Sequence, residues 1–275
     1  MGLAKNLPPH SGGQKEDCML KTLVRGLAAT AIGATLALGV SQAQAAPTPV
    51  AGIIVGGPGE TTFEFSNLTE TFVAGVGDVL SGFGRVTQIN GLFGTDFCVT
   101  GNCELTYRFD NFVATTFNPD PTESAAVFSG GTANFFVDET IDSDLATTTG
   151  FTDGTLWLSS AGFETTETLG INAGRTGSLF STGTAFADVE NIIGNGNGLL
   201  QITGGAAGNY FGIGELITLS SSFQNAIEEW ALPLAGTAEL QLVARPTEVP
   251  EPAILALLGV GLLGLGIVGR SGRRA

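Results

Sequence analysis

Carboxylates and two cysteines are the residues that could do chemistry in the central part of this chain, residues 46–247. That part holds 22 of the 26 Asp and Glu residues but no His, no Lys and no Met. It therefore lacks the commonest general base, the Schiff-base amine, the Ser/His/Asp and Cys/His arrangements, and the imidazole of zinc catalysis. Glycoside hydrolysis needs only two carboxylates about 5–10 Å apart, but so many acids form such a pair by chance. We expect no catalytic residue, no cofactor and no enzymatic activity.

The densest group of acids lies in residues 138–144, with the sequence DETIDSD. Oxygen ligands close together in sequence suit Ca²⁺, but the central Gly and terminal Glu of an EF-hand loop are missing. A solvated acidic loop after a strand is the favoured interpretation, so we assign no metal site. The segment 195–198, NGNG, is likewise interpreted as a hairpin turn.

Cys98 and Cys103 are the two cysteines of the central part. In an exported protein a disulfide is the default, and the four residues between them suit a tight hairpin with both sulfurs at its base. Two cysteines without a nearby histidine are too few ligands for a metal. We expect a structural Cys98–Cys103 disulfide that contributes about 2 kcal/mol by the loop-entropy model.

The charge of the central part is strongly negative. Four arginines against 22 acids leave a formal charge of −18 in residues 46–247. Such a surface repels phosphate groups and anionic lipids, attracts cations and keeps an exported protein soluble. Nucleic-acid binding is therefore excluded from the expected functions.

The central part reads as one all-β domain of about 200 residues. Thr- and Phe-rich runs alternate with period two between Gly, Asn, Asp and Pro residues, and predict half-buried strands. The pairs Gly130-Gly131, Asp153-Gly154 and Asn195-Gly196 are interpreted as turns. The segment 222–232 fits a helix or a strand equally. The expected fold is an antiparallel β-sandwich or jelly-roll-like domain, with strands at 61–65, 105–109, 132–137, 155–159, 199–203 and 238–243.

Aromatic side chains are a further candidate for ligand contact. Trp157, Trp230, Tyr107 and Tyr210 could stack on sugar rings, but 18 of the 22 aromatic residues are Phe. Buried Phe is ordinary in a β core. No binding site is assigned from the aromatic residues.

The N-terminal region predicts export. Lys21 and Arg25 precede an apolar stretch over residues 27–40, and an Ala-x-Ala site follows. This layout is typical of a secretory signal peptide, which implies the Sec machinery and signal peptidase as partners. A first transmembrane helix is the alternative. Cleavage is expected after Ala45, and the residues of the site are Ala43, Ala45 and Ala46.

The chain thus divides into four parts. Residues 1–18 are polar, precede Met19 and suggest a start codon placed too early. Residues 19–45 form the signal peptide, residues 46–247 the secreted β domain, and residues 248–275 a C-terminal signal.

The C-terminal signal combines a rigid motif, an apolar run and a basic end. Pro250 and Pro252 hold Glu251 in an extended segment that a processing enzyme could reach. The apolar run of residues 253–268 spans about 24 Å as a helix, which is short for a hydrocarbon core of about 30 Å. Arginines after it stay cytoplasmic by the positive-inside rule; they are Arg270, Arg273 and Arg274.

These C-terminal residues closely resemble the sorting signal of PEP-CTERM proteins. The resemblance implies a Gram-negative exporter that makes extracellular polysaccharide, and a membrane-embedded exosortase that recognises and cleaves the tail. A simple anchored periplasmic protein is the alternative. The resemblance covers about a tenth of the chain, and its residues are Val249, Pro250, Glu251 and Pro252, the run ILALLGVGLLGLGIV, and the three arginines.

Phrases in the central part, at residues 101–109, 128–138 and 153–158, look like the body of floc-associated PEP-CTERM proteins. Our first hypothesis is therefore a non-enzymatic protein in transit through the inner membrane to the cell surface or matrix, where it contributes to biofilm or floc structure. The rival is a secreted module that binds or hydrolyses exopolysaccharide through carboxylates and Ca²⁺.

Overall fold

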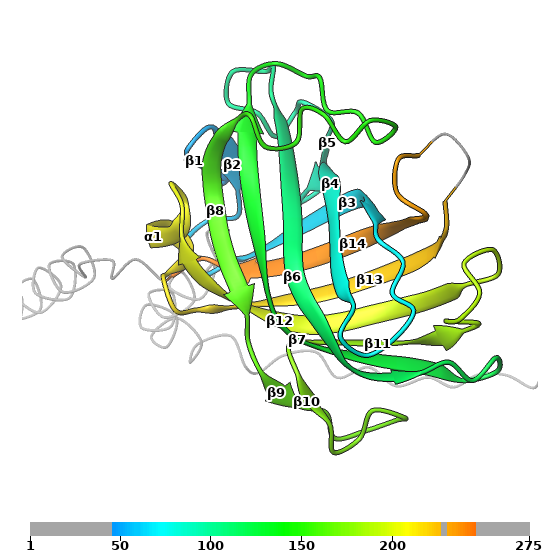
Figure 1. Ribbon diagram of the computed structural model, residues 1–275. Helices are drawn as coiled ribbons and strands as arrows, with labels where there is room; N and C mark the ends of the chain where they lie inside the picture. The colour runs from blue at the N-terminus through cyan, green and yellow to red at the C-terminus, as the bar shows by residue number, and fades with distance from the viewer. Residues whose placement is uncertain (1–45, 227–229, 246–275) are drawn as a thin grey trace, which may run out of the picture. The chain divides into compact units, whose positions relative to one another are not determined.

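The computed structural model describes residues 46–226 and 230–245. Antiparallel strands and one helical turn make up this part of the chain (Figure 1). The elements are β1 (Thr48–Val50), β2 (Ile53–Val55), β3 (Thr61–Glu70), β4 (Val79–Ile89), β5 (Leu92–Phe93), β6 (Glu104–Asn118), β7 (Ser124–Asp138), β8 (Thr155–Gly162), β9 (Thr165–Thr166), β10 (Thr176–Gly177), β11 (Leu179–Thr184), β12 (Ile193–Gly204), α1 (Gly208–Phe211), β13 (Leu216–Asn225) and β14 (Leu234–Val243).

The main sheet closes on itself into a barrel-like ring. Two meanders form it, β3 to β8 and β11 to β14, and they meet where β14 pairs with β3 and where β7 pairs with β11. Strands β8 and β11 share one place in the ring, because each pairs with one half of β7 and one half of β12. Closure leaves these main strands paired on both sides, which removes the exposed edges that open sheets must protect.

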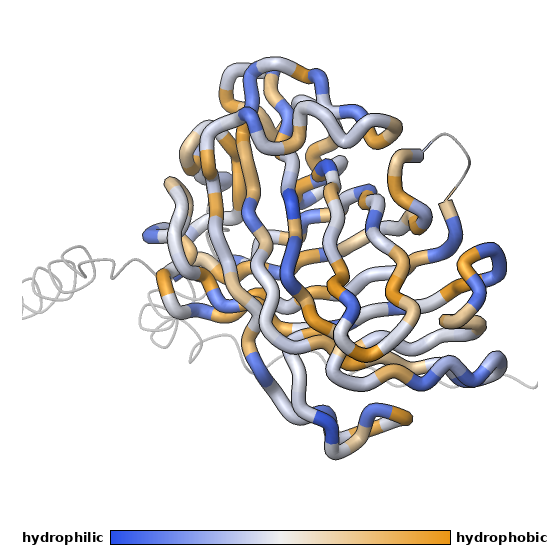
Figure 2. Tube along the Cα trace, viewed as in Figure 1, coloured by the Kyte–Doolittle hydropathy of each residue, from blue (hydrophilic) through white to orange (hydrophobic). Residues whose placement is uncertain are grey.

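The core fills the interior of the ring. Buried residues alternate with more exposed ones along strands such as β3, β4 and β12. Figure 2 shows hydrophobic and hydrophilic residues interspersed along the strands. Trp157 on β8 is buried, packs edge-on against Phe211 of α1, and donates its indole N–H to the Val50 carbonyl at 3.0 Å. The β1–β2 hairpin and α1 are thereby attached to the ring.

Glycines at inward positions make room for aromatic rings. Gly84 on β4 pairs with Tyr107 on β6, and a Cβ at Gly84 would lie 2.2 Å from the Tyr107 ring. Gly82 has the same relation to Phe109, at 2.4 Å. Only glycine allows the rings to lie across β4 in this way. The sequence SGFGR at residues 81–85 is therefore a strand, despite its two glycines.

The all-β antiparallel prediction is confirmed, and the six predicted strands lie within β3, β6, β7, β8, β12 and β14. The expected separation into the two sheets of a sandwich or jelly roll is not seen, because the long strands form one closed sheet and only the short pairs β1–β2 and β9–β10 lie outside it. Of the ambiguous segment 222–232, residues up to Asn225 belong to β13.

Two predicted turns are wrong. Gly130-Gly131 lies inside β7, where both residues have positive φ (70° and 90°) and bend the strand opposite Phe112. Residues 195–198 lie inside β12. In both cases the glycines serve close packing within a strand. Asp153-Gly154 does precede a strand, β8.

Candidate functional site

The sequence-predicted sorting and cleavage sites fall almost entirely outside the described residues. These include Val249 to Pro252, the three terminal arginines, and Ala43 and Ala45; Ala46 is the first described residue. Among residues 46–226 and 230–245, no helix has the length and apolar composition needed to cross a bilayer.

The predicted disulfide is present. Cys98 and Cys103 are bonded, with their Cα atoms 5.7 Å apart, and both are buried. They close a loop between β5 and β6, in place of the expected base of a hairpin. The Ile54 amide donates to the carbonyl of Phe97 at 2.7 Å, and Asn102 donates to the Glu139 carbonyl at 2.8 Å. The disulfide loop therefore connects the β1–β2 hairpin with the acidic loop.

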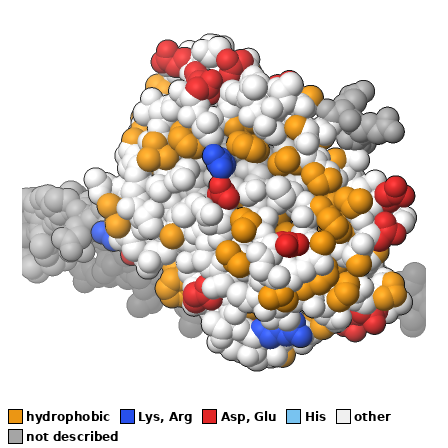
Figure 3. All heavy atoms as spheres, in the orientation of Figure 1, with side chains coloured by type: hydrophobic (Ala, Val, Ile, Leu, Met, Phe, Trp, Pro, Cys, Tyr) orange, Lys and Arg blue, Asp and Glu red, His pale blue; other side chains and the backbone are white. Residues whose placement is uncertain are grey.

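The acidic loop, residues 138–154, follows β7 and is anchored by Glu104. The carboxylate of Glu104 is buried and accepts hydrogen bonds from the amides of Asp142 (3.1 Å) and Ser143 (2.9 Å) and from the Ser143 hydroxyl (2.5 Å). Arg85 lies 4.0 Å from the same carboxylate. Figure 3 shows acidic side chains gathered at this end of the domain. Glu104 was missed in the sequence because nothing local marks it as the partner of a loop 38 residues away.

Three carboxylates of this region come together. Ligand oxygens of Asp138, Asp142 and Asp153 lie within 4.8 Å of one another, and Asp142 and Asp153 are exposed. Calcium takes six to eight oxygen ligands. The cluster supplies three side-chain carboxylates, which is part of such a ligand set.

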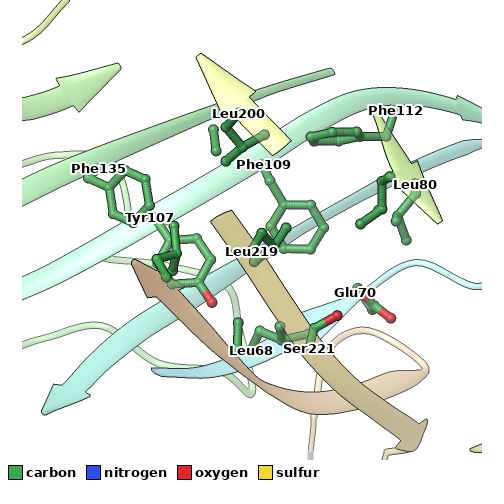
Figure 4. A pocket seen from close by; sticks show the side chains of 14 residues that line it. Leu68, Glu70, Leu80, Tyr107, Phe109, Phe112, Phe135, Leu200, Leu219 and Ser221 are labelled. Atoms are coloured by element: carbon green, nitrogen blue, oxygen red, sulfur yellow. The ribbon is translucent and has the colours of Figure 1, made fainter. Parts of the chain in front are cut away.

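The interior of the ring contains a second group of polar residues. Figure 4 shows Glu70, Tyr107 and Ser221 among the apolar side chains that line a cavity of about 50 Å³. Tyr107 and Ser66 are hydrogen-bonded through their hydroxyls at 2.8 Å. Glu64, further along the same inward face of β3, is fully buried, and neither of its carboxyl oxygens has a hydrogen-bond partner within the described residues.

Burial determines the ionisation of these interior groups. It raises the pKa of Glu64 and of Glu70 to about 8, from an ordinary value of 4.5. Burial also raises the pKa of Tyr107; the hydrogen bond with Ser66 lowers it, and the neighbouring Glu70 and Glu64 raise it further. Both carboxyl groups are therefore protonated and neutral at pH 7.

The two interior glutamates do not form a hydrolytic pair. They lie six positions apart on the extended strand β3, which is about 20 Å at about 3.4 Å per residue. Paired carboxylates of glycoside hydrolases lie about 5–10 Å apart and flank the substrate. Glu64 and Glu70 instead line the closed interior of the sheet.

The outer face of the sheet carries a groove that we call the outer groove. It consists of two hollows, of about 640 and about 480 Å³, that share Asn195, Ser222 and Thr237. Outward side chains form two adjacent rows across β12, β13, β14 and β3. One row contains Asn197, Ser220, Glu239 and Phe65; the other contains Asn195, Ser222, Thr237 and Asn67.

The lining of the outer groove combines polar side chains with apolar surface and is almost uncharged. Amides and hydroxyls are the majority in the larger hollow, whereas the smaller hollow adds Ile193 and Phe223 to its polar residues. Among the described lining residues, Glu239 is the one carboxylate, and there is no Lys or Arg. Phe65, with 37% of its surface exposed, lines the larger hollow, and Trp230 lines the smaller one.

The segment NGNG, residues 195–198, was predicted to be a turn, and its contribution to the outer groove was therefore missed. In β12, Asn195 and Asn197 point outward, and Gly196 and Gly198 point inward. A Cβ at Gly198 would lie 2.4 Å from the Ser178 carbonyl, so the backbones of β11 and β12 approach too closely for a side chain. The detectable signal was the strict alternation of Asn and Gly from residue 194 to 198, which has the period of a strand.

The comparisons with known proteins identify the C-terminal part of the chain. A family model described as the PEP-CTERM protein-sorting motif matches residues 248–274. No curated protein and no solved structure matches the chain. The family match implies export, processing by an exosortase and sorting to the cell surface. Residues 248–274, which follow the disulfide-bonded β domain in the sequence, therefore carry a PEP-CTERM protein-sorting motif.

Proposed function

We propose that the β domain is a non-enzymatic structural component of the extracellular matrix of a Gram-negative bacterium, with a role in biofilm or floc formation. The sorting motif at residues 248–274 is the observation that carries this proposal, since it belongs to proteins delivered to the outside of the cell. The chemistry of the domain supports it further. A matrix component needs solubility and contact surfaces, and residues 46–247 offer a charge of −18 without His or Lys.

The positions of the acids support a non-enzymatic role. A carboxylic general acid needs both a raised pKa and access to substrate. Among the described residues, the two carboxyl groups with a raised pKa, Glu64 and Glu70, lie inside the sheet. The acids of the loop at 138–154 instead lie at the surface of the domain, where Glu139, Asp142, Asp144 and Asp153 are exposed.

The sorting step is tested by replacing Pro250, Glu251 and Pro252 together with alanine in the producing organism. Pro246→Ala, a proline outside the matched motif, is the control. Mass spectrometry of surface-exposed protein is expected to find the C-terminus shortened in the wild type and in the control. The triple variant should stay with the membrane fraction and keep Arg274-Ala275. Intact Arg274-Ala275 on wild-type protein at the surface would contradict processing and leave a simple anchor.

The matrix role is tested separately by deleting the gene and measuring aggregation of the cells. Loss of flocculation that is restored by the wild type, but not by the triple variant, supports the proposal. Unchanged aggregation and unchanged matrix mass in the deletion strain would overturn it, even if the sorting result holds.

A further inference from the structure

We infer that the outer groove binds a neutral polysaccharide chain through the amide and hydroxyl rows of β12, β13, β14 and β3. This inference rests on the proposed matrix function and names the ligand class of one surface of the domain. One row begins at Asn197 and the other at Asn195 on β12. Both rows cross the neighbouring strands on the same face of the sheet.

The hydrogen-bonding groups of the groove match those of a polyhydroxylated chain. Asn side chains both donate and accept, hydroxyls do the same, and the Glu239 carboxylate accepts. Sugar hydroxyls also donate and accept, so each lining group finds a partner. A carboxylate gives the stronger, charge-assisted bonds of such a site. Gln241 donates to Glu239 at 3.0 Å and holds that carboxylate in place.

The charge of the groove selects against other polymers. An anionic polysaccharide or a nucleic acid would approach a surface whose described residues include one carboxylate and no cation, on a domain with a formal charge of −18. Such an approach is repulsive and lacks the Lys and Arg contacts that phosphate or carboxylate recognition requires. A neutral chain meets no such penalty.

The shape of the groove suits a chain better than a compact molecule. From β12 to β4 its lining crosses five neighbouring strands, or about 19 Å at about 4.8 Å between strands. Small-molecule sites are enclosed, whereas this groove is long and open to solvent. Because the ring is closed at these strands, a peptide cannot bind here by adding a strand to an edge.

Aromatic faces complete the match. Phe65 is exposed in the larger hollow, and Trp230 lines the smaller one. The C–H face of a sugar ring is apolar and packs on an aromatic ring while the sugar hydroxyls bind the polar rows.

Affinity electrophoresis of the purified full chain tests this inference. Native gels contain dextran, galactomannan or soluble β-glucan as neutral probes, and alginate as the anionic one. Retardation is expected in at least one neutral gel, and none is expected in alginate. Equal mobility of the wild type in all gels, or retardation by alginate alone, would overturn the inference.

Two arginine substitutions on β13 locate the site. Ser220→Arg fills the groove, and the new side chain can pair with Glu239 directly across the ladder, so the fold tolerates it. It should weaken binding roughly tenfold or more. Leu216→Arg adds the same group to the same face of the same strand, four residues away and outside the groove lining, and should leave binding unchanged.

Asn197→Ala is a milder variant that still tests the site if an arginine variant fails to fold. It removes one exposed amide and should weaken binding by roughly 3- to 10-fold, the cost of one or two hydrogen bonds. Equal binding by the wild type, Ser220→Arg and Asn197→Ala would contradict the site. Location in the matrix and processing of the C-terminus are measured independently, so a domain that reaches the matrix without binding glycan refutes the inference and not the proposed function.

Discussion

On β3, successive residues alternate between the interior of the ring and the outer groove, and each face carries polar side chains. Glu64 and Glu70 face inward, where they are buried and neutral at pH 7. Phe65 and Asn67 face outward into the groove. An acid on the inner face cannot serve a ligand outside, whereas an amide on the outer face is free to bind one. The face of the strand on which a polar residue lies therefore decides, more than its residue type, whether it can contact a ligand.

The inner face also contrasts with the outer face in its tolerance of change. Inward glycines such as Gly84 and Gly198 lie in contact with rings or backbone, so even a methyl group there has no room. Outward Asn and Ser residues of the groove border solvent. Substitutions on the inner face of these strands should therefore change stability, and substitutions on the outer face should change binding.

The largest expected effect concerns the buried acid. The folded state holds the Glu64 proton up to about pH 8, and the unfolded chain releases it near 4.5, so the free energy of unfolding falls as pH rises between these values. The loss is at most about 5 kcal/mol for one residue at about 1.4 kcal/mol per pKa unit. Glu64→Gln removes this term, so the variant should be more stable than the wild type at pH 8. Urea denaturation at pH 5 and pH 8 measures the difference, and an unchanged pH slope in the variant would refute the inner-face assignment.

The second effect concerns packing on the inner face. Gly84→Ala places a Cβ 2.2 Å from the ring of Tyr107, which its hydrogen bond with Ser66 holds in place. Overpacking of this kind costs about 1–3 kcal/mol. Thermal unfolding should show a lower Tm. Gly75→Ala, at a site where a Cβ meets open space, is the matched control and should leave Tm nearly unchanged.

The neighbouring residues Asn197 and Gly198 on β12 allow the outer and inner faces to be compared directly. Gly198→Ala should destabilise by about 1 kcal/mol or more, because the Ser178 carbonyl must move. Asn197→Ala should change stability by less than about 0.5 kcal/mol, as is usual for exposed positions. Chemical denaturation of the two variants compares them directly. Equal destabilisation by both would mean that the strand does not divide into a packed face and a free face.

The smallest effect is expected for the outer acid. Glu239→Gln should leave the free energy of unfolding within about 0.5 kcal/mol of the wild type at both pH 5 and pH 8. It is the counterpart of Glu64→Gln, with the same chemical change on the opposite face. A pH dependence altered as strongly as that of Glu64→Gln would erase the distinction between the two faces.

Much of the fold was predictable where the signal is local. Thr- and Phe-rich alternation located the strands at 61–65 and 132–137, and the spacing of Cys98 and Cys103 predicted their disulfide. Prediction failed where a glycine within a strand imitates a turn, at Gly130-Gly131 and in residues 195–198. At both places glycine is required because a neighbouring strand or ring approaches too closely for a side chain, and the local sequence does not reveal that approach.

By itself the sequence determined the sorting motif, the net charge and the all-β class of the protein. Each of these depends on composition or on patterns of residues that are neighbours in the chain. Only the tertiary structure decided that the sheet closes, since β14 pairs with β3 across some 170 residues of chain. That closure puts Glu64 inside and Glu239 outside, and it brings Asn197 and Phe65 into one groove. Pairing between distant strands sets register, and register decides which face each side chain occupies.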